Sequence, residues 1–241
     1  MQDPVFSGDK FEYLKLIPNL VNPTLKIPML ADYSENALYM ASLKAIQQFL
    51  SSTEHLVEQS NPSEDDPKPS YFMKVAYTQH AIGYRGAKIW ETSATSILNE
   101  VMRLAQDKEK SVYPYVMLQP FFSSYEYKII VLNGVASHNV KATQKKNAKA
   151  FGTEQDRFLF AEQVVAAFQE ACPHMLDNGK GLWRVDIIKD VEGNYLVNEL
   201  EHMDALMCPS RPSSAKGEGS TAYSFLVDYW HQKLQELISL L

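Results

Sequence analysis

Acidic residues gather in two neighbouring apolar segments of the C-terminal half of the chain. Asp186 follows Arg184 in the first segment, and Glu199 and Glu201 lie in the second, after the turn-forming residues 191–193. If the segments pair as a hairpin, the alternation of strand side chains places Glu199 and Glu201 on one face, and the fold-back brings Asp186 close to Asn198 and Glu199, in a register that the sequence leaves open. Gathered carboxylates repel one another, and a hard divalent cation such as Mg2+ removes that repulsion. The pattern predicts a magnesium site; the alternative is a hairpin with solvated acids.

A lysine interrupts the apolar segment 71–75. Lys74 needs an anion or solvent for its ammonium group, because burying an unpaired charge is costly. Gly83, Arg85 and Gly86 follow shortly afterwards. Glycines let backbone N–H groups approach a phosphate closely, and an arginine adds positive charge. The segment is typical of a phosphate-binding loop; the alternative is an edge-strand lysine followed by an ordinary turn.

A strand end with aromatic residues follows further along the chain. Gln119 precedes Pro120, and Phe121 and Phe122 come directly after it. Proline interrupts a strand ladder, so this point is predicted to be a turn or a connection between lobes. Exposed backbone groups beside aromatic rings would suit a flat purine, although a plain strand end has the same pattern.

Basic residues form a last set. Lys128 lies two positions after Glu126, on the same face of a predicted strand, and Lys141 lies in the next strand. Lysines at positions 145, 146 and 149 fall in a predicted loop. Lysines can neutralise a phosphoryl group during its transfer, but such runs are also common in solvated loops. Ser137 and His138 point to opposite strand faces and do not form a nucleophile–base pair.

The elements that must position these residues alternate between strand pairs and single helices. Helices are predicted for residues 36–58, from a cap at Thr92 or Ser93, from a cap at Thr153 to Pro173, and for 223–240. Strands are predicted for residues 71–77, 87–90, 113–118, 125–132, 135–141, 182–189 and 194–201. Asn133-Gly134 is the strongest hairpin signal. This order predicts an α+β fold with antiparallel sheets.

Composition narrows the classes of function. The 241 residues carry a formal charge of -6, which argues against a protein that binds nucleic acid mainly through phosphate contacts. Two cysteines do not make a disulfide scaffold or a metal site. The N-terminal residues lack an apolar signal core, and no apolar run approaches the roughly 20 residues of a membrane helix. We therefore expect a cytoplasmic protein with no membrane or nucleic-acid partner.

The order of these parts resembles the ATP-grasp family, particularly its glutathione-synthetase-like and ribosomal-protein glutamate-ligase-like branches. The likeness covers residues 71–207. It implies two lobes whose antiparallel sheets enclose ATP, with residues 60–118 as the N-terminal lobe and 119–241 as the C-terminal lobe. Residues 1–59 would then be the remnant or substitute of an acceptor-binding domain.

The resemblance also implies roles for individual residues. Nucleotide-binding roles fall on Lys74, Gly83, Arg85, Gly86, Gln119, Phe121, Phe122 and Glu126. Catalytic roles fall on Lys128, Lys141 and Arg184, and magnesium-binding roles on Asp186, Glu199 and Glu201. A second phosphate-binding lysine is common in the family, and both Lys26 and Lys44 are candidates. Glu201 stands where many members have asparagine.

The function implied by the resemblance is an ATP- and magnesium-dependent ligase. Such an enzyme activates a carboxylate as an acyl phosphate, and an amine then attacks it. The acceptor would be a small molecule or a peptide, and a partner chain or a dimer would complete its site. Two alternatives stay open: a kinase of a small polyol or inositol phosphate, and a nucleotide-binding module without turnover.

Overall fold

The computed structural model describes most of the chain up to residue 202. The described residues are 10–30, 36–57, 70–75, 87–89, 93–107, 114–122, 125–141, 151–173 and 181–202, with His231 and Gln235. The helices are α1 (Lys10–Leu14), α2 (Asn36–Thr53), the 3-10 helix η1 (Glu54–Leu56), α3 (Ala94–Ala105) and α4 (Glu154–Ala171). The strands are β1 (Leu25–Pro28), β2 (Tyr71–Val75), β3 (Ala87–Ile89), β4 (Tyr115–Pro120), β5 (Tyr127–Leu132), β6 (Val135–Lys141), β7 (Leu182–Lys189) and β8 (Tyr195–His202).

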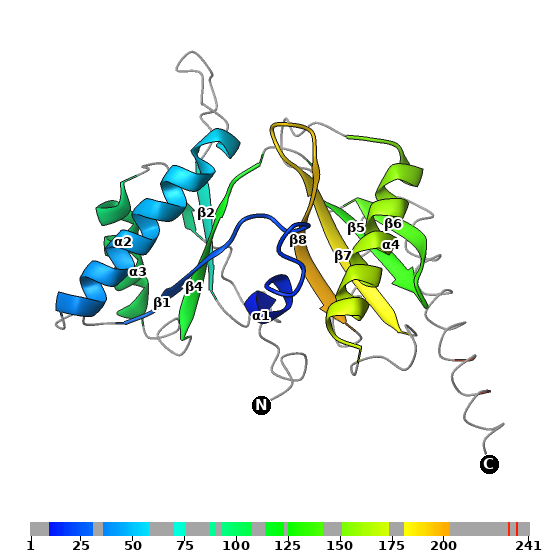
Figure 1. Ribbon diagram of the computed structural model, residues 1–241, viewed down its shortest axis with the longest axis horizontal. Coiled ribbons are helices and arrows are strands. Elements are labelled where there is room, and N and C mark those ends of the chain that lie inside the picture. Colours follow the sequence, from blue (N-terminus) through cyan, green and yellow to red (C-terminus); the bar gives the residue numbers. More distant parts are fainter. Residues whose placement is uncertain are drawn as a thin grey trace. The chain divides into compact units, whose positions relative to one another are not determined.

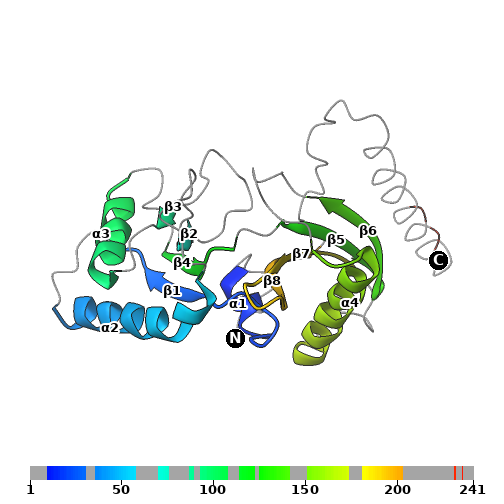
Figure 2. The same ribbon diagram turned by 90° about the horizontal axis from the view of Figure 1, so that it is seen from above.

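The first sheet has the strand order β1-β4-β2-β3, with antiparallel pairing throughout. Helices α2 and α3 lie on one side of it (Figures 1 and 2). The apolar stripe of α3 packs on that face, as its helical spacing predicts. The resulting core consists mainly of Ile27, Ile46, Tyr71, Met73, Val75, Ile97, Leu98, Val101, Leu104, Val116 and Leu118. Lys26, Met117 and Lys74 form one row across the opposite face, because Met117 pairs with both lysines.

The second sheet has the strand order β6-β5-β7-β8 and is also antiparallel. Helix α4 covers one of its faces (Figures 1 and 2). The predicted hairpin between β5 and β6 is confirmed: Asn133 and Gly134 have φ angles of 52° and 82°, as a tight two-residue turn requires. Thr153 caps α4 in a capping box with Asp156, which confirms the predicted helix start.

The buried stripe of α4 differs from the predicted one. Ala161, Val165 and Phe168 are buried as expected, but Phe160 is buried where Phe158 was predicted, and Phe158 and Cys172 are only partly buried. Arg157, in the first turn of α4, is also buried, and its guanidinium carbon lies 4.0 Å from the Tyr127 ring centroid. The buried face of α4 therefore begins with Arg157 and Phe160 instead of Phe158.

Strand β4 extends two residues further than predicted. It ends at Pro120, which lies opposite Tyr71. Proline is tolerated there because Phe121, the next residue, supplies an N–H that donates to the Ser70 carbonyl at 3.1 Å. The prediction that Pro120 ends the strand is confirmed. The predicted helix 223–240 lies outside the described residues, apart from His231 and Gln235, which are helical.

A short N-terminal segment connects the two sheets. Val21 forms a parallel bridge with Val197 of β8, in which Val197 N donates to the Leu20 carbonyl at 2.8 Å and Asn22 N donates to the Val197 carbonyl at 2.9 Å. The buried side chain of Asn22 donates to the Pro120 carbonyl at 3.2 Å. Residues 20–24 therefore bond to β8 and to the end of β4.

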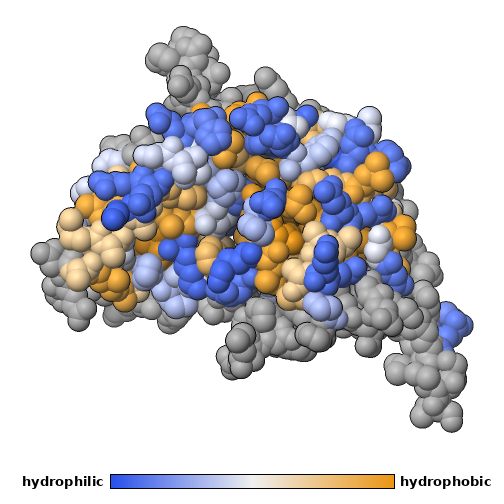
Figure 3. Space-filling model, in the orientation of Figure 1, coloured by the Kyte–Doolittle hydropathy of each residue, from blue (hydrophilic) through white to orange (hydrophobic). Residues whose placement is uncertain are grey.

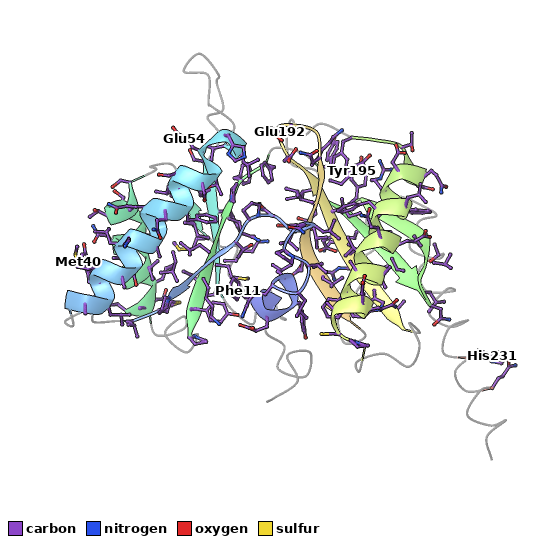
Figure 4. All side chains as sticks on the ribbon, viewed as in Figure 1. Phe11, Met40, Glu54, Glu192, Tyr195 and His231 are labelled. Atoms are coloured by element: carbon purple, nitrogen blue, oxygen red, sulfur yellow. The ribbon has the colours of Figure 1, made fainter. Side chains whose placement is uncertain are left out.

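The described surface mixes polar and apolar side chains. Figure 3 shows hydrophilic and hydrophobic residues side by side over the elements of both sheets. Met40 on α2 is one of the exposed large apolar residues (Figure 4). Within the described residues, no helix combines the length and hydrophobicity needed to cross a bilayer.

Candidate functional site

The pairing of β7 with β8 settles the register of the acidic hairpin. Asp186 lies directly opposite Glu199, whereas the neighbouring residue Ile187 pairs with Val197. Asn198 is therefore an extra residue in β8, and it forms a β-bulge at this point. A bulge increases the local twist and re-aims the side chains beside it. The hairpin prediction is confirmed, and the bulge brings the two carboxylates into register.

Arg184 joins the two carboxylates. Its Nε donates to Asp186 Oδ1 at 2.7 Å, and its Nη2 donates to Asp186 Oδ2 at 3.0 Å. The same Nη2 also donates to Glu199 Oε2 at 3.2 Å. One cationic nitrogen thus contacts an oxygen of each acid, so a single positive centre is sufficient to bridge Asp186 and Glu199.

Lys128 approaches Asp186 from the other neighbouring strand. It pairs with Asp186 across β5 and β7, and its Nζ donates to Asp186 Oδ2 at 3.1 Å. Glu126 lies on the same side, with Oε1 at 3.9 Å from Lys128 Nζ. Three neighbouring strand segments therefore contribute charged side chains to one area, with Asp186 at its centre.

Asp186 is completely buried, and its environment opposes ionisation. The pKa of its carboxyl is raised to about 7, mainly because burial removes it from water and also because Glu199 and Glu126 are negatively charged, although Arg184 and Lys128 lower it. Two nearby cations do not fully compensate for the burial of this carboxylate. A titratable group with a pKa shifted this far is typical of a functional site.

The first sheet reaches this cluster through Lys74. Its Nζ donates to Asn198 Oδ1 at 3.0 Å, and Asn198 Nδ2 donates in turn to Glu126 Oε2 at 3.0 Å. Lys74 and Asn198 are separated by 124 positions in the sequence. Lys74 therefore contacts the acidic hairpin, and its phosphate-binding role stays a prediction.

The Gln119–Phe122 connection has a mixed environment. Gln119 is buried, its Nε2 donates to Thr24 Oγ1 at 2.8 Å, and its Oε1 has no hydrogen-bond partner among the described residues. The Phe122 ring is buried against Leu56 and Ile188. Its backbone, and the half-buried Phe121, remain the parts of this connection that are suited to contact a base.

Several predicted site residues fall outside what the structure describes. Gly83, Arg85 and Gly86 lie outside the described residues, as do the lysines at 145, 146 and 149. The backbones of Lys141 and Glu201 are described and pair with Tyr127 and Arg184, but their side chains are not.

The two candidates for a second phosphate-binding lysine differ in position. Lys26 lies in the same sheet row as Lys74, with its Nζ 4.0 Å from the Tyr115 ring centroid and 3.5 Å from Glu12 Oε1. Lys44 is exposed on α2. The row across the sheet favours Lys26 over Lys44.

Sequence reasoning placed Asn198 near Asp186 but gave it no role. The structure shows the irregularity: Val197 and Leu200 are both buried but stand three positions apart, whereas a regular strand buries every second residue. Such a break in alternation is typical of a bulge.

The residues fit a magnesium ion by their chemistry. Among the described side chains, no three from His, Cys, Asp and Glu lie close enough to form a metal site together. Two carboxylates are nevertheless sufficient, since Mg2+ prefers oxygen ligands and usually completes its shell with water and substrate phosphates. Arg184 Nη2 donates to Asp186 at 3.0 Å and to Glu199 at 3.2 Å, so the two carboxylates already share one positive group.

Comparisons with known proteins identify the fold. No family profile matches the sequence, and no curated protein matches it. D-cycloserine synthetase DcsG matches 83% of this chain at 18% identity with a TM-score of 0.55, and the match covers 64% of DcsG. The ATP-grasp ligase PsnB bound to a minimal precursor matches 80% of the chain at 14% identity (TM-score 0.44, 51% of PsnB). The D-alanine-D-alanine ligase of Coxiella burnetii matches 80% at 15% identity (TM-score 0.46, 45% of that ligase).

This likeness and the two antiparallel sheets show that the chain has the α+β ATP-grasp fold. The chain spans less than two thirds of the length of these solved structures. The fold is therefore established by structural similarity, whereas the activity must be argued from the residues of the site.

Proposed function

We propose that this chain, with its ATP-grasp fold, is a magnesium-dependent ligase that uses ATP to join a carboxylate to an amine. A carboxylate oxygen attacks the γ-phosphorus of ATP and releases ADP. The amine nitrogen then attacks the carbonyl carbon of the acyl phosphate, inorganic phosphate leaves, and the nitrogen loses a proton. The observation that carries this proposal is the bridge between Asp186 and Glu199, where one nitrogen contacts both acids.

Asp186 and Glu199 would hold the magnesium ion. When bound, the metal supplies positive charge that neutralises the phosphate oxygens. Arg184 would then be available to bind a phosphate or carboxylate, to which its planar N–H fork is suited. The Arg184 side chain is 13% exposed, so it is largely enclosed by the residues of the site.

Lys74 and Lys128 would bind the phosphates from opposite sheets. Lys74 comes from β2 and Lys128 from β5, and both end in the area around Asp186 and Glu126. Positive charges fixed in place before the reaction stabilise the negative charge of a transferring phosphoryl group without further reorganisation. Lys141, Glu201 and residues 83–86 would complete this set, and the connection at residues 119–122 would contact the adenine.

The acceptor in this proposal is a small molecule or a peptide. Residues 1–59 would take part in binding it. The match covers 64% of DcsG, so about one third of DcsG lies outside the region matched here. We also propose that a partner chain or a second copy contributes to the acceptor site.

A thermal-shift titration with ATP and magnesium tests nucleotide binding. Ligand that binds only the native state raises the melting temperature as its concentration exceeds the dissociation constant. We expect a magnesium-dependent rise for the wild type that Glu199→Ala abolishes. Glu192→Ala is the matched control, because Glu192 is an exposed acid at the tip of the same hairpin (Figure 4). No rise in the wild type at millimolar ATP would contradict the proposal.

Product analysis then tests the reaction class. A ligase releases phosphate from ATP only when a carboxylic acid and an amine are both present. A kinase instead transfers the phosphate to a stable ester, and a binding module does neither. Turnover that requires both a carboxylic acid and an amine would support the ligase. Transfer of the phosphate to a stable ester would contradict the ligase and support the kinase.

A further inference from the structure

We propose that Asn198 is a positioning residue that keeps the charge of Lys74 available for an anionic ligand. This inference rests on the proposed nucleotide site. Asn198 is the bulge residue of β8, and its amide lies between Lys74 and Glu126. The amide separates a lysine and a glutamate that would otherwise be suited to form an ion pair.

The hydrogen bonds allow only one orientation of this amide. The Lys74 ammonium can only donate, so it takes the amide oxygen at 3.0 Å. The ionised Glu126 carboxylate can only accept, so it takes the amide nitrogen at 3.0 Å. Both ends of Asn198 are therefore satisfied by partners of opposite charge, although the side chain itself is neutral.

The Asn198 side chain is neutral, and this determines how much of the Lys74 charge is available to a ligand. An amide oxygen orients the ammonium without cancelling its charge, whereas a carboxylate in the same place would cancel it. Glu126 meanwhile lies near Lys128, with 3.9 Å between Oε1 and Nζ, so it has a second positive neighbour of its own. Glu126 and Asp186 are therefore both close to Lys128. The neutral Asn198 side chain lies between Glu126 and Lys74, so the positive charge of Lys74 is left for a ligand.

The bulge is what makes this arrangement possible. With regular pairing, Asn198 would lie opposite Asp186, because Ile187 pairs with Val197. The extra residue instead gives Glu199 the place opposite Asp186 and leaves Asn198 free to reach Lys74 of the first sheet. One irregularity in β8 therefore supplies both the acidic pair and the neutral spacer.

Three substitutions test the charge role against a merely structural one. Asn198→Asp keeps the size and shape of the side chain, but it places a carboxylate against Lys74 and replaces the N–H group that donates to Glu126 with an acceptor. Asn198→Ala removes the side chain. Asn194→Asp is the matched control, because it adds the same charge at an exposed turn residue of the same hairpin. The readout is the dissociation constant of MgATP and of adenosine, measured with the full chain by isothermal titration calorimetry.

We expect Asn198→Asp to weaken MgATP binding by roughly tenfold or more, since hydrogen bonds to charged groups contribute that much to an equilibrium. Asn198→Ala should weaken it less, and neither Asn194→Asp nor the binding of adenosine should change by more than about twofold. A merely structural role predicts that adenosine binding weakens as much as MgATP binding. An equal loss for adenosine, or a smaller loss of MgATP affinity in Asn198→Asp than in Asn198→Ala, would overturn the inference.

The unfolding of each variant without ligand is measured by chemical denaturation as a separate check, so that affinity is compared only among folded proteins. If Asn198→Asp does not fold, Asn198→Glu and Asn198→Gln give the same charged and neutral comparison. Should the wild type bind neither MgATP nor adenosine, the proposed function fails, and the inference fails with it. MgATP binding that Asn198→Asp leaves intact overturns the inference alone.

Discussion

Asp186 and Glu199 lie directly opposite each other on β7 and β8, and one nitrogen, Arg184 Nη2, donates to both of them. Asp186 is completely buried, whereas Glu199 is about one quarter exposed. The buried acid depends on its cation for stability, and the exposed one can exchange its partner for a ligand from solvent. Asp186 is therefore held in place by its protein partners, whereas the Glu199 carboxylate opposite it is accessible to a ligand.

Removal of Arg184 should destabilise the protein. Arg184→Met removes one of the two cations that contact the buried Asp186 carboxylate among the described residues and leaves Lys128, and breaking a buried ion pair costs about 3 kcal/mol or more. The free energy of unfolding, measured with urea, checks this. Arg103→Met is the control, because the exposed Arg103–Glu100 pair should contribute less than about 1 kcal/mol. Adding Asp186→Asn to Arg184→Met should recover most of the loss; a loss equal to that of Arg103→Met would contradict the prediction.

The free energy of unfolding should fall as the pH rises from the ordinary pKa of Asp186, 3.8, to its raised pKa of about 7. Burial raises its pKa from the ordinary 3.8 to about 7, so between these values the native state retains a proton that the unfolded chain has released. The native state therefore binds more protons, and its stability decreases from about pH 4 to pH 7 by up to ~4 kcal/mol for this group. The test is to measure the free energy of unfolding with urea across this pH range for the wild type and for Asp186→Asn. The decrease should be smaller in Asp186→Asn, and equal decreases in the two proteins would contradict the prediction.

Lys128 should matter for ligand binding beyond its packing. Its side chain is about one third exposed, and its Nζ donates to Asp186 Oδ2 at 3.1 Å, so its charge can contact both the acid and a phosphate. Lys128→Met should weaken MgATP binding by about tenfold or more, because a charge-assisted hydrogen bond is lost. Lys15→Met is the control, since Lys15 is an exposed lysine paired with Glu12. Equal affinities for the two variants, measured by calorimetry, would remove Lys128 from the site.

Gly152 should tolerate no larger residue. It has a φ of +59°, and an added Cβ would overlap the Tyr195 hydroxyl. Figure 4 shows Tyr195 at the end of β8 nearest Glu192. Gly134→Ala is the control for backbone strain alone, because Gly134 has a φ of +82° and open space around it. We expect Gly152→Ala to cost about 1–3 kcal/mol more than Gly134→Ala in unfolding free energy, through overpacking.

Tyr195→Phe in the Gly152→Ala background extends this experiment. Loss of the hydroxyl opens the space that the new methyl group needs, so the double variant should regain the steric part of the loss and keep the backbone strain. A double variant as unstable as Gly152→Ala would show that the hydroxyl is not the obstacle.

Much of this protein is determined by local sequence. Asn133-Gly134 specifies its hairpin because both residues tolerate a positive φ, and Thr153 starts α4 because its hydroxyl accepts the free N–H of Asp156. The strands that carry Lys74, Lys128, Asp186 and Glu199 follow from their apolar runs. These features depend on neighbours a few positions apart, so the chain itself contains the information for them.

Tertiary structure decided what depends on distant contacts. The alternation of β8 left the partner of Asp186 open by one residue, and only pairing with β7 placed the extra residue at Asn198. The Lys74–Asn198 bond joins residues 124 positions apart, and the burial of Phe160 instead of Phe158 depends on how α4 packs on its sheet. Side-chain alternation and helical spacing define a face but not the neighbour that covers it, so these contacts emerged only with the assembled sheets.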